Sequence, residues 1–119
     1  MLDYQTAKDL FEEIQVAAAA NNEESLMSDL LFQSLDYSQF LVNEEMEHMF
    51  HDEDDDFRMS ITEETKRSHE KNLIATINAI GTFLKVKTIK SVLVEDSDKI
   101  DFAKYVVLLV IEDLRKRLE

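Results

Sequence analysis

The most constraining feature of this sequence is its lack of the residues that make tight turns. The 119 residues include no proline and a single glycine, Gly81. A β-sheet protein reverses its chain often and relies on such residues where it does so. Helices joined by a few polar connections need far fewer of them. The sequence therefore predicts an all-α protein, and its length is typical of one domain, here residues 1–119.

Hydrophobic periodicity predicts how many helices there are. Apolar residues recur at three- and four-residue spacing in four segments, and the stripe of the second segment includes Leu35, Val42 and Met46. Asp3 precedes the first segment at the position of a helix cap. We expect a compact antiparallel bundle of about four helices over residues 4–20, 23–51, 61–94 and 98–118, with the third kinked or broken near residue 85.

The acidic run at residues 52–56 is expected to interrupt the bundle. Five consecutive carboxylates repel one another, and aspartate is a poor helix former. Ser60 and Glu63 follow at capping-box spacing, which marks the start of a helix. We therefore expect a loop over residues 52–59.

Residues 85–94 combine two patterns. Val86, Thr88 and Ile89 are β-branched, which favours a strand, but the segment also keeps helical spacing. Because no other segment could pair with a lone strand, we expect continued or kinked helix. Gly81, just before it, costs about 1 kcal/mol relative to alanine in a helix, and we expect a compensating close helix crossing there, where a side chain would not fit.

Charge is distributed unevenly along the chain. Residues 1–59 carry a net charge of −14 and residues 60–119 a net charge of +1, which gives the total of −13. Such a field repels nucleic acid and anionic lipid and attracts basic protein surfaces. We expect no direct nucleic-acid binding and no membrane binding. The first two helices are expected to share an acidic face formed by Asp9, Glu12, Glu13, Glu23, Glu24, Asp29, Asp36, Glu44 and Glu47.

The acidic face supports a hypothesis about function. Carboxylates spaced along rigid helices can dock on a basic partner, so we expect a non-enzymatic protein that acts through protein–protein interaction. An inhibitor, an immunity protein or a nucleic-acid mimic would act in this way. The alternative is a solvated face that only keeps the protein soluble. A further alternative is a structural homo-oligomer, formed through the broadly apolar last helix and the apolar residues Met46, Met49, Phe50 and Phe57.

Metal binding is the third functional class considered, and its weak candidates are Glu44, Glu45, His48 and His51. Glu45 and His48 have the Glu-x-x-His spacing of di-iron bundles. Those sites need a second such pair and two further glutamates. His69 has Lys66 three positions before it, so the second half is missing. A polar surface cluster is favoured, and no cofactor is expected.

The acidic run also resembles a calcium-binding loop in part. Asp52, Asp54, Asp56, Ser60 and Glu63 fall at positions 1, 3, 5, 9 and 12 of the EF-hand template. The sixth position requires glycine for a sharp turn but is occupied by phenylalanine. This departure argues against an EF-hand.

Enzyme motifs are lacking. The chain has no cysteine, and one glycine is too few for a glycine-rich phosphate loop or a Gly-x-Ser-x-Gly elbow. The longest apolar run, residues 105–111, is too short for a membrane span, and no secretory leader is visible. These features favour a non-enzymatic cytoplasmic protein.

Overall fold

The computed structural model describes the backbone of residues 2–50 and 56–119 and the side chains of residues 2–46 and 63–119. The helices are α1 (Tyr4–Ala20), α2 (Glu24–Phe50), α3 (Asp56–Phe83), α4 (Thr88–Val92) and α5 (Asp96–Leu118). No strand occurs in these residues. The all-α prediction is confirmed, and there are five helices because the third expected segment is divided in two.

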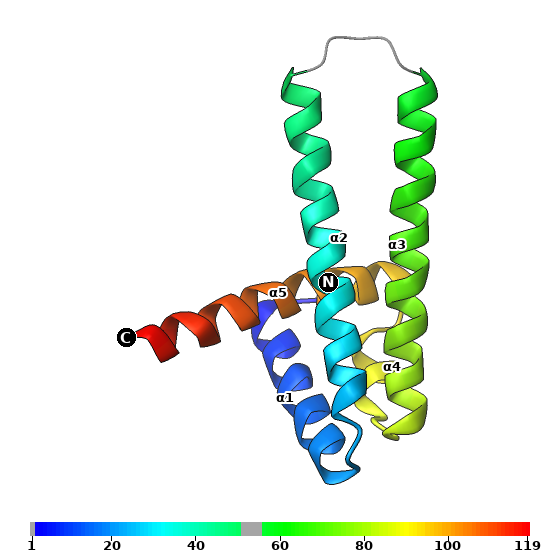
Figure 1. The fold of residues 1–119 in the computed structure, drawn as a ribbon. Helices are drawn as coiled ribbons and strands as arrows, with labels where there is room; N and C mark the ends of the chain where they lie inside the picture. Colours follow the sequence, from blue (N-terminus) through cyan, green and yellow to red (C-terminus); the bar gives the residue numbers. More distant parts are fainter. Residues whose placement is uncertain (1, 51–55) are drawn as a thin grey trace.

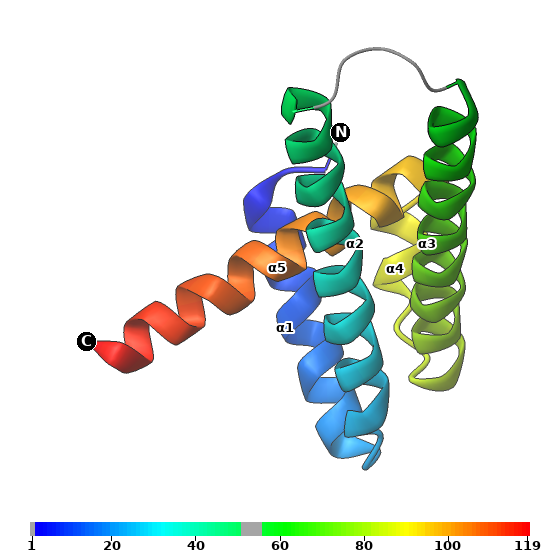
Figure 2. The same ribbon diagram turned by 45° about the horizontal axis from the view of Figure 1, so that its top comes forward.

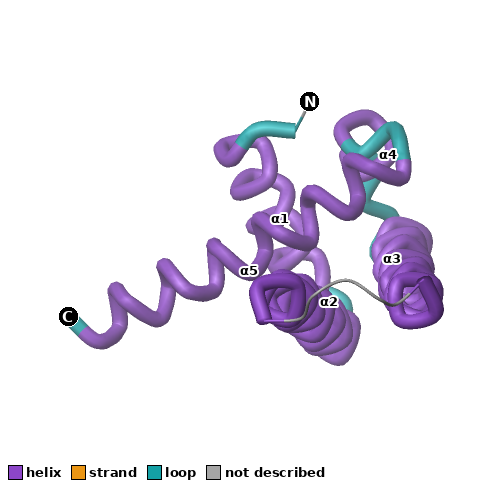
Figure 3. Tube along the Cα trace, turned by 90° about the horizontal axis from the view of Figure 1, so that it is seen from above, coloured by secondary structure: helices purple, strands orange, loops and turns teal. Residues whose placement is uncertain are grey.

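Two long helices form the frame of the molecule. α2 and α3 stand side by side and run in opposite directions, with α1 packed beside the lower half of α2 (Figure 1). α5 runs across the other helices and contacts α1, α2 and α3, and its C-terminal end projects away from them (Figure 2). The view from above shows α1 and α3 on different sides of α2 (Figure 3).

The core lies where α1, α4 and α5 meet the N-terminal half of α2 and the C-terminal half of α3, which are the lower halves of these two helices in Figure 1. Ile14, Leu30, Ile77 and Phe102 come from four different helices and are almost fully buried in the main cluster. A smaller cluster joins α2, α3 and α5 and consists of Tyr37, Leu73, Ile100 and Ala103. Each of these four helices therefore buries one apolar face against the others.

The cap expected at Asp3 is confirmed. The backbone N–H of Thr6 donates a 2.7 Å hydrogen bond to Oδ1 of Asp3. This hydrogen bond lowers the pKa of the Asp3 carboxyl below its ordinary value of 3.8. α1 then buries the apolar stripe Ala7, Leu10, Phe11, Ile14 and Ala18.

The expected loop at residues 52–59 is wrong in its second part. α3 already begins at Asp56, so residues 56–59 are helical and the Ser60 position lies inside the helix. An aspartate in the first turn is favoured by the helix dipole, and the three residues after it include no helix breaker. The rest of that expectation, at residues 52–55, lies outside the described part of the chain.

The break expected near residue 85 is confirmed. α3 ends at Phe83, and Lys85 has a φ of 57°, in the left-handed region. The short helix α4 follows, and Val86, Ile89 and Leu93 fill the main core from this segment. The β-branched residues therefore serve packing and do not form a strand.

The expectation for Gly81 is wrong. A Cβ atom built on this glycine would lie 3.5 Å from Cδ1 of Ile89, which is ordinary van der Waals contact. The crossing of α3 with α4 therefore leaves room for a methyl group.

Candidate interaction surface

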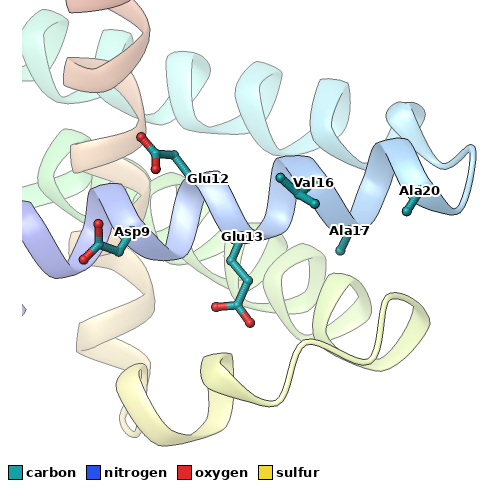
Figure 4. A pocket seen from close by; sticks show the side chains of 6 residues that line it. All are labelled: Asp9, Glu12, Glu13, Val16, Ala17 and Ala20. Atoms are coloured by element: carbon teal, nitrogen blue, oxygen red, sulfur yellow. The ribbon is translucent and has the colours of Figure 1, made fainter.

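The outer face of α1 carries three of the predicted carboxylates. Asp9, Glu12 and Glu13 lie opposite the buried stripe and are exposed. Together with Val16, Ala17 and Ala20 they line a shallow surface on this one helix (Figure 4). The carboxylates occupy the N-terminal part of this surface and the small apolar side chains the rest.

The glutamates of this face point in different directions. Glu13 points toward α4 (Figure 4), where the hydroxyl of Thr88 donates a 2.9 Å hydrogen bond to its Oε1. Glu12 points to the other side of α1, and Asp9 forms a 3.0 Å hydrogen bond with Gln5 within the helix. Glu12 and Asp9 are thus the α1 carboxylates turned toward solvent.

The predicted carboxylates of α2 lie at its start and along its edge next to α3. Glu23 and Glu24 are exposed where the chain turns from α1 into α2. Gln33 of α2 accepts a 2.7 Å hydrogen bond from the hydroxyl of Thr76 of α3 and so marks the edge of α2 next to α3. Asp29 lies four residues before Gln33 and Asp36 three residues after it, and both aspartates are exposed. Residues at this spacing share a helix face, so both aspartates belong to the edge near α3.

An apolar row separates this edge from α1. This row consists of the apolar residues Phe32, Leu35, Val42 and Met46, whose side chains are 47–70% exposed. With Gln39 between Leu35 and Val42, its members follow one another at intervals of three and four residues. We call this row the α2 seam. The assignment of Leu35, Val42 and Met46 to the core stripe is therefore wrong. Both rows of α2 have the same helical period, so periodicity alone could not show which row the other helices cover.

The structure consequently divides the predicted acidic face. Exposed carboxylates occupy α1, the turn into α2 and the edge of α2 near α3, with the α2 seam between α1 and that edge. Glu44 is half-buried, and the side chain of Glu47 lies outside the described part.

The metal candidates are not brought together in the described part of the chain. Glu44 is half-buried and Glu45 exposed, while the side chains of His48 and His51 lie outside that part. The described side chains include no group of three or more that could hold a metal ion. The helical backbone of residues 56–63 also differs from a calcium-binding loop, in which most of these residues form a turn.

Few polar side chains of the described residues enter the interior. The hydroxyl of Tyr37 donates a hydrogen bond to Glu70, and burial together with Glu70 raises the pKa of Tyr37 above its ordinary value of 10.0. Among the described residues, Ser34 has a buried hydroxyl with no hydrogen-bond partner. The exposed carboxylates therefore remain the main chemical feature, and they suit the binding of cationic groups.

No protein-family model, curated protein or solved structure matches this chain. Separately, none of the described helices combines the length and the apolar content needed to cross a membrane.

Proposed function

We propose that this protein is non-enzymatic and acts through protein–protein interaction, docking its acidic surface on a basic partner. The acidic surface consists of Asp9, Glu12, Glu23, Glu24, Asp29 and Asp36. An inhibitor, an immunity protein or a nucleic-acid mimic works in this way, by occupying a basic groove on its target.

One observation carries the proposal. The two ion pairs found among the described side chains, Lys99–Asp96 and Arg117–Asp113, both lie within α5. No described basic side chain therefore forms an ion pair with the carboxylates of α1 or α2. The negative electrostatic field of these carboxylates therefore extends into solvent, where it accelerates association with a basic protein.

The rigidity of the helices supports the same proposal. Asp9 and Glu12 project from one face of α1, and Cβ atoms three residues apart on a helix are about 5–6 Å from each other. The buried stripe of α1 holds this helix in place. Carboxylates held at such spacing meet a groove lined by lysine and arginine without first being ordered, which lowers the entropic cost of binding.

The test is affinity capture of the tagged protein at low and at moderate salt, with the retained protein identified and purified. We expect a basic partner that binds the purified chain at low salt and is released as salt rises. The Asp9→Lys/Glu12→Lys variant should lose this partner.

The matched control is Glu63→Lys/Glu64→Lys, which changes the net charge equally. These glutamates are exposed in the first third of α3. The beginning of α3 lies away from α1 (Figure 1). The control should keep most of the binding. If both variants bind the purified partner as well as the original chain does, the acidic surface is not the docking site.

A further inference from the structure

The C-terminal end of α5 buries none of its side chains in its own chain, and the hydroxyl of Tyr4 donates a hydrogen bond to Glu112 at its start. Leu109 is the last buried residue, and residues 111–119 are all exposed. This segment, which we call the α5 tail, projects away from the other helices (Figures 1 and 2). A segment of this length forms only a marginal helix by itself in water, so packing against a partner would stabilise the α5 tail.

The α5 tail carries a row of apolar residues of the kind that normally packs against another helix. Ile111, Leu114 and Leu118 are 48–87% exposed and are spaced by three and four residues. Their row continues the one formed by Ile100 and Ala103, which packs with α2 and α3 in the smaller core cluster. The same face of α5 is thus covered where it crosses α2 and uncovered beyond it.

The α2 seam is a second uncovered row with the same spacing. Phe32, Leu35, Gln39, Val42 and Met46 follow one another at intervals of three and four residues. This alternation is the pattern of helices that pack side by side in coiled coils and bundles. One chain therefore presents two exposed helical rows of matching geometry.

The charges beside the two rows are complementary. Asp36 directly follows Leu35 of the seam, and Arg115 directly follows Leu114 of the tail. Both residues are exposed, and they occupy equivalent positions relative to their rows. When two such rows pack against each other in antiparallel orientation, the flank of α2 that carries Asp36 lies beside the flank of α5 that carries Arg115. α2 contains no lysine or arginine, whereas residues 115–117 are the longest basic run in the chain.

We propose that two copies of this chain form a symmetric dimer in which the α5 tail of each copy packs antiparallel on the α2 seam of the other. In the proposed register Leu118 lies opposite Leu35 and Ile111 opposite Val42, and Asp36 and Arg115 lie on the same flank, offset by two residues along the helices. A two-fold axis repeats the contact, so the dimer covers both tails and the Leu35–Val42 part of both seams. The dimer shares Asp36 with the acidic surface, but its apolar residues do not belong to that surface, so it can form without the basic partner.

The first test is the mass of the purified chain by light scattering over a range of concentrations. We expect twice the chain mass of 13.9 kDa at high concentration. Two variants should be monomeric, Leu114→Gln/Leu118→Gln in the tail and Leu35→Gln/Val42→Gln in the seam. Glutamine is a good helix former and these positions are exposed, so circular dichroism should show preserved helices.

The control variant is Phe83→Gln/Val94→Gln, which removes two apolar side chains that are equally exposed but lie outside both rows. It should remain dimeric. A monomeric original chain at every concentration would overturn the proposal. A dimer that survives the seam variant would also overturn it, because the tails would then pair with each other.

A charge exchange tests the register. Asp36→Arg and Arg115→Asp each place like charges together twice in the dimer, so each should weaken dimerisation about 10-fold. An equal mixture of the two variants restores opposite charges at both contacts and should form a heterodimer. If mixing gives no heterodimer while each variant alone dimerises normally, Asp36 and Arg115 do not meet.

Discussion

The hydroxyl of Tyr37 donates a 2.9 Å hydrogen bond to Oε2 of Glu70 and thereby joins α2 to α3. The tyrosine is only 2% exposed, whereas Glu70 is half-buried. The ring of Tyr37 packs in the smaller core cluster, so this residue contributes both apolar burial and a hydrogen bond to a charged group.

Replacing Tyr37 with phenylalanine should keep the packing and remove the hydrogen bond. We expect Tyr37→Phe to lower the free energy of unfolding by about 1.5 kcal/mol, which is typical of a hydrogen bond to a charged acceptor. Urea unfolding of the two proteins measures the difference. An unchanged free energy would mean that water replaces the hydroxyl at no cost.

Stability should also depend on Tyr37 at high pH. Burial, and then Glu70, raises the pKa of Tyr37 above the ordinary value of 10.0, so the folded protein holds this proton more tightly than the unfolded chain does. This contribution is complete below about pH 10 and is lost as the pH rises further. The loss of stability above pH 10 should be smaller in Tyr37→Phe. If the original chain and Tyr37→Phe lose equal stability above pH 10, the loss is due to groups other than Tyr37.

Ser34 is a site where the protein can be stabilised. It is 0% exposed, and its hydroxyl has no hydrogen-bond partner within the described residues. Because an unpaired buried hydroxyl is unfavourable, Ser34→Ala should raise the free energy of unfolding by about 1 kcal/mol. Ser38→Ala, one turn later and half-buried, controls for the higher helix propensity of alanine. A gain no larger than that of the control would show that Ser34 is satisfied in solution.

Gly81 offers a second stabilising substitution. The methyl group of alanine would make ordinary contact with Ile89, and alanine is favoured over glycine in a helix by about 1 kcal/mol. We expect Gly81→Ala to raise the melting temperature. A lower melting temperature would show that α4 cannot accommodate the methyl group.

Salt should stabilise the fold. The carboxylates of α1 and α2 repel one another at low ionic strength, and added salt screens this repulsion. We expect the melting temperature to rise from low to moderate NaCl. The measurement is best made on Leu114→Gln/Leu118→Gln, in which the proposed dimer does not contribute. A flat curve would indicate that basic residues of the second half already neutralise these helices.

Much of the local structure could be predicted from sequence. The bounds 4–20 expected for the first helix are those of α1, because Asp3 caps its start and the apolar stripe is unbroken. The last helix was expected over residues 98–118 and spans Asp96–Leu118. These features depend on neighbours a few residues away, which a sequence displays directly.

The candidate surfaces could be predicted only in part. The exposure of Asp9, Glu12, Asp29 and Asp36 follows from their charge, but their division between α1 and the α3 edge of α2 does not. That division depends on the side from which α3 approaches α2, and contacts between distant segments leave no local pattern.

The sequence by itself determined that the chain is helical, because it has no proline, one glycine and apolar residues at helical spacing. Only the tertiary structure decided which apolar rows are covered. Leu30 and Leu35 both lie on apolar rows of α2, yet Leu30 is buried and Leu35 faces solvent. The physical reason is that the hydrophobic effect favours burial of any apolar row, whereas the packing of α1, α3 and α5 around α2 leaves only one of its faces covered.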